Sequence, residues 1–194
     1  MIPIKVLVPS GVLGLGFDLE ALNNGVKNNP DIISIDGGST DSGPYSLGSG
    51  TSKYSRAAIK AEWKSLMIAR KKANVPLVIG SCGTCGTNRM VDWMENITIE
   101  LAEELNQNIK IAKLYCQQEK NFIKKNFQLR KIFPLNPAPM LNDQLIEEMT
   151  NIVALAGAEI ILAGRTTDTA IISALPLMKG ANPGSSWHGA KVVE

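Results

Sequence analysis

Short apolar runs alternate along this chain with longer segments whose apolar residues recur every three or four positions. Five of the runs have the length and composition of buried strands: Ile4–Val8, Ile32–Ile35, Val75–Gly80, Ile109–Tyr115 and Ile160–Ala163. The segments with helical spacing predict helices over residues 19–27, 55–73, 89–106, 119–127, about 143–156 and 168–175.

Single residues predict several of the helix ends. Asp18 stands before an apolar i, i+3, i+7 stripe, so it is the expected N-cap of the first helix. Asn142 or Asp143 is the expected cap of the helix that runs to about residue 156. The last helix should stop near Pro176, and the stretch Pro134–Pro139 cannot be regular helix, because proline lacks an amide donor.

The alternation of strands and helices predicts one α/β domain over residues 1–194. A helical crossover of this length returns the chain in parallel. The expected fold is therefore a doubly wound, mainly parallel sheet of about five strands with helices on both faces. Apolar strands fit a sheet that is covered on both sides. The last residues, Lys191–Glu194, have the pattern of an approach to another strand, so we expect the chain to be cut short there.

Composition argues against several classes of partner. The chain has 194 residues, 44% hydrophobic and 20% charged, as in an ordinary soluble globular protein. A net charge of +2 and an aromatic content of 5% argue against nucleic acid, and no apolar run approaches the length of a membrane span. One basic cluster is expected to be a solvated helix face, with an anion-binding patch as the alternative: Lys120, Lys124, Lys125, Arg130 and Lys131.

Three cysteines without a secretory leader predict a reducing, cytoplasmic location and free thiols. Cys82 and Cys85 form a CxxC at the expected start of a helix, where a thiol pKa falls, as in disulfide oxidoreductases. Zinc would need two further ligands, for which the chain offers only Cys116 and His188. We therefore expect no metal and a tight loop of small residues, with redox chemistry as the alternative. His188 is expected to be structural, with general acid–base work as the alternative.

The most polar loop follows the second strand. Residues 36–45 contain two carboxylates, three hydroxyls and three glycines. Open α/β sheets bind ligands at the carboxyl ends of their strands, so Asp36 and Asp41 are candidate catalytic carboxylates. The neighbouring hydroxyls are candidate substrate ligands: Ser39, Thr40 and Ser42. The alternative is a turn in which these side chains only satisfy the backbone.

Two later loops have the same position and character. Residues 80–88 open a long helix, so their N–H groups are candidates to cradle a phosphate or carboxylate. In residues 164–170, Arg165 suits bidentate binding of either anion, and Asp168 either caps the next helix or orients Arg165. The candidate substrate-binding residues of both loops are Ser81, Gly83, Thr84, Gly86, Arg165, Thr166 and Asp168. An earlier loop, residues 9–16, has the order GxxGxG and predicts a close-packed turn more than a dinucleotide site.

Four segments together resemble the acyclic terpene utilisation (AtuA) family: Ser34–Tyr45 (SIDGGSTDSGPY), Ile79–Gly86 (IGSCGTCG), Leu162–Ala170 (LAGRTTDTA) and Pro183–Lys191 (PGSSWHGAK). The resemblance covers essentially the whole chain and implies the N-terminal part of a longer architecture. The family is named for bacterial breakdown of terpenes such as citronellol, and its relatives belong to organic-acid or acyl-CoA catabolism. The resemblance implies a pathway of this kind without fixing a reaction. Relatives are expected to have small residues in place of Cys82 and Cys85, which weighs against redox and zinc chemistry.

Two functions from different classes remain open. The first is a catabolic enzyme, a hydratase or lyase, that acts on a small carboxylic acid or acyl-CoA thioester. Asp36 or Asp41 would be the base, Arg165 would hold a carboxylate, and residues 81–86 would stabilise an oxyanion or bind phosphate. The second is a non-catalytic binding subunit that needs a C-terminal part or a partner, either another protein or a second copy. A CxxC redox protein ranks lower, and the sequence does not identify a cofactor.

Overall fold

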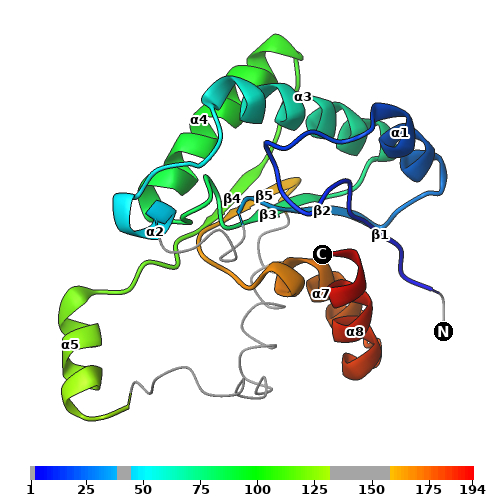
Figure 1. The fold of residues 1–194 in the computed structure, drawn as a ribbon. Helices are drawn as coiled ribbons and strands as arrows, with labels where there is room; N and C mark the ends of the chain where they lie inside the picture. The colour runs from blue at the N-terminus through cyan, green and yellow to red at the C-terminus, as the bar shows by residue number, and fades with distance from the viewer. Residues whose placement is uncertain (1–2, 39–44, 132–157) are drawn as a thin grey trace.

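The computed structural model describes residues 3–38, 45–131 and 158–194 of the chain. Within these ranges five strands form one sheet in which all neighbours are parallel, as predicted. Its order is β1-β2-β3-β5-β4, so β1 and β4 are the edges (Figure 1). The strands are β1 (Val6–Leu7), β2 (Ile32–Asp36), β3 (Leu77–Gly80), β4 (Ile111–Leu114) and β5 (Ile160–Ala163).

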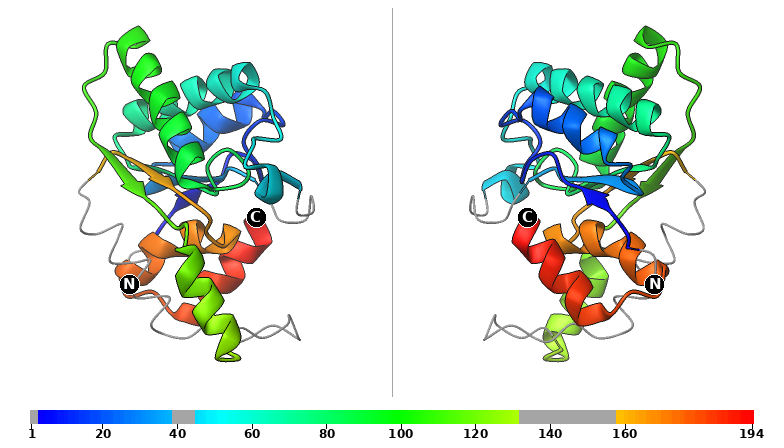
Figure 2. Two further views of the ribbon diagram at one scale, coloured as in Figure 1. Left: turned by 90° about the vertical axis from the view of Figure 1, so that its left-hand side faces the viewer. Right: turned by 90° about the vertical axis from the view of Figure 1, so that its right-hand side faces the viewer.

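Helices cover both faces of this sheet, which confirms the doubly wound α/β class. One layer contains α1 (Leu19–Lys27), α3 (Arg56–Ala73) and α4 (Asn88–Glu104), and the opposite layer contains α7 (Asp168–Met178) and α8 (Pro183–Val193). Figure 2 shows the two layers from both sides. The short α2 (Tyr45–Ser49) precedes α3, and α5 (Lys120–Gln128) follows β4. No helix within the described ranges is long and apolar enough to span a bilayer.

Two sequence predictions fall on residues outside the described ranges: the proline-rich connection Pro134–Pro139 and the helix over about 143–156. The basic cluster can be placed in part. Lys124 and Lys125 of α5, and Arg130 and Lys131 after it, have exposed side chains, as expected for a solvated face.

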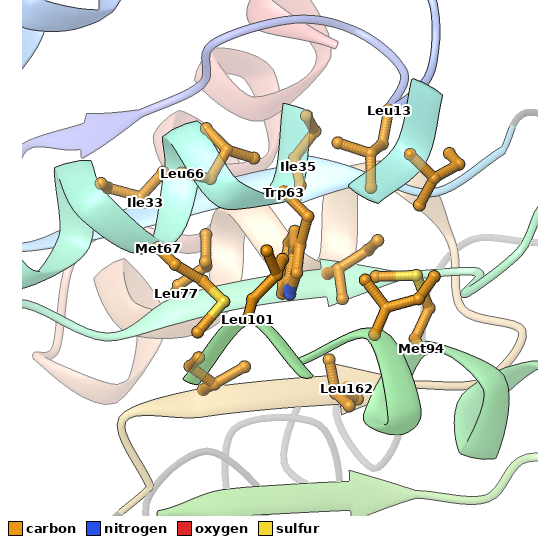
Figure 3. Packing of buried hydrophobic residues seen from close by; sticks show 14 of the residues in the cluster. Leu13, Ile33, Ile35, Trp63, Leu66, Met67, Leu77, Met94, Leu101 and Leu162 are labelled. Carbon is orange, nitrogen blue, oxygen red and sulfur yellow. The ribbon is translucent and has the colours of Figure 1, made fainter. Parts of the chain in front are cut away.

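The main hydrophobic core lies between the sheet and the layer of α1, α3 and α4 (Figure 3). Alternate residues of β2 pack on opposite faces of the sheet. Ile33 and Ile35 pack in this core, while Ile32 packs in a smaller core on the α7 side. Trp63 of α3 is fully buried, and its Nε1 donates a hydrogen bond to Thr98 Oγ1 of α4 at 2.9 Å. Burial of both faces explains why the strands are apolar without alternation.

One prediction about the end of the chain is wrong. The segment that contains Lys191–Glu194 does not approach a strand, because residues 183–193 form helix α8. Asn182 caps this helix, since its Oδ1 accepts the Ser185 amide at 3.0 Å, and Pro183 stands at the helix start, where its missing N–H costs nothing. The preceding helix, α7, ends close to Pro176, as predicted.

Candidate functional site

The chain leaves two neighbouring strands toward opposite faces of the sheet. After β3 it enters α4 on one face, and after the adjacent β5 it enters α7 on the other (Figure 1). In open α/β sheets such a divergence at the carboxyl ends of strands is where ligands bind. The described parts of the three polar loops meet here: residues 37–38 after β2, 81–87 after β3 and 164–167 after β5. We call this region the three-loop edge.

Arg165 ties the three loops together. Its Nη1 donates hydrogen bonds to the carbonyl oxygens of Gly38 at 2.9 Å and Thr84 at 3.0 Å. Both N–H groups of this nitrogen are therefore committed to the protein's own backbone. The sequence predicts Arg165 as a donor to a carboxylate or phosphate, and it does not reveal this structural role. In the described part of the chain, Nε and Nη2 have no such partner, so they are the atoms with which Arg165 can reach an anion.

The backbones of the three loops are packed too closely for side chains at two positions. A Cβ on Gly38 would lie 2.3 Å from the Cα of Thr84, and a Cβ on Gly86 would lie 2.5 Å from the amide nitrogen of Arg165. The Arg165 amide also donates to the Gly86 carbonyl at 3.1 Å. Glycine is required here for close approach, and the loops form one packed unit.

The amides of the loop after β3 are largely satisfied within the protein. Those of Ser81 and Thr84 donate to carbonyls of the two neighbouring loops, that of Cys82 donates to the carbonyl of Ala163 at the end of β5, and those of Cys85 and Gly86 donate within their own loop. In this conformation these five amides are not available to an anion. The predicted N–H cradle for phosphate or an oxyanion is therefore not formed by them.

Asp36, the last residue of β2, is a buried carboxylate. Only 6% of the residue is exposed, and within the described residues neither carboxylate oxygen has a partner at good hydrogen-bond geometry, although the Gly37 and Gly38 amides lie close enough to lower its pKa. Burial first, and the negative charge of Asp168 second, raise the pKa of Asp36 from 3.8 to about 7. The Gly38 and Gly37 amides and the Arg165 guanidinium act in the opposite direction without cancelling this effect. The group can therefore gain or lose a proton near neutral pH.

Asp168 lies at the start of α7, near enough to Asp36 for its charge to act on that carboxylate. It does not cap that helix: the N-cap is Thr167, and Asp168 is the first helical residue. Burial, followed by a hydrogen bond shared with the Glu194 side chain, raises the pKa of Asp168 to about 6, while Arg165 and Lys191 lower it. The Glu194 carboxylate also accepts a hydrogen bond from Lys191 Nζ at 2.8 Å.

The end of α8 thus reaches the three-loop edge, which sequence reasoning missed. A Cβ on Gly11, in the loop after β1, would lie 3.3 Å from the carbonyl oxygen of Glu194. No motif points to this contact, because it depends on the helical rise of a segment predicted to be extended. Glu194 therefore supplies a further carboxyl group beside Asp168.

The other predicted residues of the two later loops face different directions. Ser81 is fully buried, and its Oγ donates to the Thr166 carbonyl at 3.3 Å. Thr166 Oγ1 is buried without a hydrogen-bond partner among the described residues and would lie 2.4 Å from a Cβ on Gly80. Gly83, by contrast, packs against Met90 of α4, where an added Cβ would lie 2.7 Å from the Met90 sulfur. Gly83 therefore lies against α4 and not toward Asp36. The predicted Asp41, Ser39, Thr40 and Ser42 lie outside the described residues.

The GxxGxG loop after β1 holds a carboxylate that belongs to the protein. The amides of Gly14 and Gly16 donate to the two side-chain oxygens of Glu62, at 2.7 and 2.8 Å. A Cβ on Gly14 would lie 2.6 Å from the ring of Tyr54. This is the close-packed turn that the sequence predicts, and its anion-binding amides are filled by α3.

Cys82 and Cys85 are both fully or almost fully buried, at 0% and 1% exposure. Burial raises the pKa of the Cys82 thiol far above its ordinary range, which disfavours the reactive thiolate. Among the described residues, no group of three or more His, Cys, Asp or Glu side chains is arranged to hold a metal ion. His188 lies exposed on α8. Buried thiols at the bottom of a packed loop weigh against redox chemistry at this CxxC.

Comparisons with models of protein families, with curated proteins and with solved structures find no match to this chain. The arguments on function therefore rest on the geometry of the three-loop edge.

Proposed function

We propose that this chain belongs to a catabolic enzyme, a hydratase or lyase, that acts on a small carboxylic acid or acyl-CoA thioester. Asp36 is the general acid–base in this proposal. The observation that carries it is a carboxylate that is buried at the carboxyl end of a parallel strand, where three polar loops meet, and that has a pKa of about 7. A general acid–base works best when its pKa lies near the operating pH.

Hydration of a double bond next to a carbonyl and the reverse elimination both require a proton transfer. The proton is added to, or removed from, the carbon atom next to that carbonyl. Asp36 takes or delivers that proton, since at neutral pH it is populated in both protonation states. Arg165 holds the carboxylate or carbonyl oxygen of the substrate through Nε and Nη2, while Nη1 keeps its loops together. Asp168 supports the proton on Asp36 by its negative charge. Asp41 remains the second candidate for the base.

Solvent deuterium exchange tests this proposal before the substrate is known. The protein is incubated in D₂O with a panel of small carboxylic acids and their CoA thioesters, and mass spectrometry detects deuterium on carbon and addition or loss of water. We expect at least one compound to exchange. Replacement of Asp36 by asparagine should slow the exchange by a factor of about 10² or more.

Glu103→Gln is the matched control, because it also removes one carboxylate but lies exposed on α4, away from the site. Compounds that bind without exchange would favour the alternative of a non-catalytic subunit that needs a C-terminal part or partner. Exchange that survives in Asp36→Asn would assign the base elsewhere, with Asp41 the next to replace.

A further inference from the structure

A hollow lies beside the three-loop edge, between α4 and the connection from α2 to α3. It has a volume of about 510 Å³, within the range of small-molecule sites. Arg89, Trp93 and Asn96 line one wall; their i, i+4, i+7 spacing places them on one side of α4. Thr51 and Ser52 line the opposite wall. We call this space the α4 hollow.

The side chains of the α4 hollow offer an aromatic face and a cation. Trp93 is half-buried and packs against the main core, which anchors its indole, while it also lines the hollow. Arg89 is exposed, and its Nη2 donates to the carbonyl of Gly50, which holds the guanidinium beside the hollow. A held guanidinium suits phosphate, and an anchored indole suits a planar base.

The acidic residue of the hollow, Asp92, is bonded to β4 and the residue after it. Asp92 accepts hydrogen bonds from the Tyr115 hydroxyl and from Lys113 Nζ, and these bonds lower the pKa of Asp92. Lys113 also pairs with Glu95 at 2.7 Å. The charges of Asp92 and Glu95 are therefore balanced by those of Lys113 and Arg89, and Arg89 is the one of these two cations that lines the hollow.

The hollow is joined to the three-loop edge by direct contacts. Met90, which lines the hollow, packs against Gly83 of the loop after β3. On the other wall, the residue after Ser52 is Lys53, whose amide donates to Thr84 Oγ1 at 3.1 Å. One loop therefore separates the α4 hollow from Arg165, which bonds to the carbonyl of Thr84.

We propose that the α4 hollow binds a nucleotide moiety, with the base against Trp93 and a phosphate on Arg89. The substrate of the proposed enzyme is then a thioester on a nucleotide-bearing carrier such as coenzyme A, and not a free acid. A small free acid would occupy the three-loop edge alone and leave the hollow unused. The assignment of the substrate class rests on the proposed function, whereas nucleotide binding does not.

Calorimetry on the whole chain tests this with coenzyme A, adenosine 3′,5′-bisphosphate, AMP, pantetheine and inorganic phosphate as probes, with tryptophan fluorescence as a second signal. We expect coenzyme A and the bisphosphate to bind and pantetheine not to bind. Trp93→Leu and Arg89→Gln should each weaken binding about tenfold or more, as expected for loss of one base stack or one phosphate contact.

Arg56→Gln is the matched control, since Arg56 is another exposed arginine of the same helical layer, paired with Glu100. Failure of coenzyme A and the bisphosphate to bind, or binding that neither hollow variant weakens, would overturn the proposal. Binding of AMP without binding of coenzyme A would assign the hollow to a free nucleotide and refute the substrate class. Nucleotide binding without deuterium exchange on any compound would refute the proposed function but not nucleotide binding in the hollow. Exchange on free acids alone would support the proposed function and refute the assignment of a nucleotide-bearing substrate.

Discussion

Replacing Asp36 with asparagine should stabilise the protein at neutral pH, although Asp36 is a proposed catalytic residue. The carboxamide has nearly the shape of a protonated carboxyl group but cannot ionise. The variant therefore stands in for the protonated state of Asp36 at every pH. The difference between the free energies of unfolding of the variant and the parent measures how much the ionised carboxylate destabilises the folded protein. This difference should change with pH.

The magnitude follows from the raised pKa of Asp36. The unfolded chain ionises this group near 3.8, whereas the folded protein keeps its proton up to about 7. Between these values the unfolded state gives up a proton that the folded state retains, so stability falls as pH rises through this window. The difference between about 7 and 3.8, at roughly 1.4 kcal/mol for each pKa unit, is about 4 kcal/mol. Asp168, with its pKa raised to about 6, lowers stability in the same direction over a narrower window.

Urea unfolding of the parent and of Asp36→Asn at about pH 4, 5, 6, 7 and 8 gives the comparison. The free energy of unfolding of the variant relative to the parent should grow by about 4 kcal/mol from pH 4 to pH 8 and level off above pH 7. Glu103→Gln, which removes an exposed carboxylate, should show no such trend. A difference between Asp36→Asn and the parent that is the same at all pH values would refute the argument that burial holds the proton on Asp36.

Three further predictions concern the packed loops. Arg165→Met should lower the free energy of unfolding by about 3 kcal/mol, because it removes two charge-assisted hydrogen bonds to carbonyls; a loss well under 1 kcal/mol in urea unfolding would contradict this. Gly38→Ala should cost about 3 kcal/mol or prevent folding, since its Cβ would lie 2.3 Å from backbone, whereas Gly189→Ala, with open space around it, should not destabilise. Cys82 and Cys85 should stay reduced, bind no stoichiometric zinc by elemental analysis, and react with a thiol reagent only when the protein unfolds; rapid reaction of the native protein would show that the loop is open.

The fold class follows from the sequence because both faces of the strands are buried. Ile33 and Ile35 face one core and Ile32 the other, so the run is apolar throughout, which is typical of a covered parallel strand. The order of the strands does not follow in the same way. Placing β5 between β3 and β4 depends on which strand edge remains open when the chain returns, and no local pattern encodes that.

The location of the candidate site could be predicted from the sequence, but the environment of its side chains could not. Polar loops after parallel strands had to share one edge, and the bonds from Arg165 to Gly38 and Thr84 show that they do. The burial of Asp36 could not be read from the sequence, since it depends on how closely the glycines let three backbones approach. The position of Glu194 was not predicted, because Val192 and Val193 favour a strand locally. The N-cap at Asn182 favours a helix instead, and the segment is helical.

The two edges of the sheet bear on how this protein avoids aggregation. An unpaired strand edge is a template on which another chain can add, and natural sheets blunt such edges by short length, proline or charge. At one edge, β1 pairs over only Val6 and Leu7 and is followed by Pro9. At the other, β4 carries Lys113 at its middle, held by carboxylates of α4. Exchanging this lysine for valine would leave a flat apolar edge, and we expect such a chain to form intermolecular β-structure at concentrations at which the parent remains dispersed.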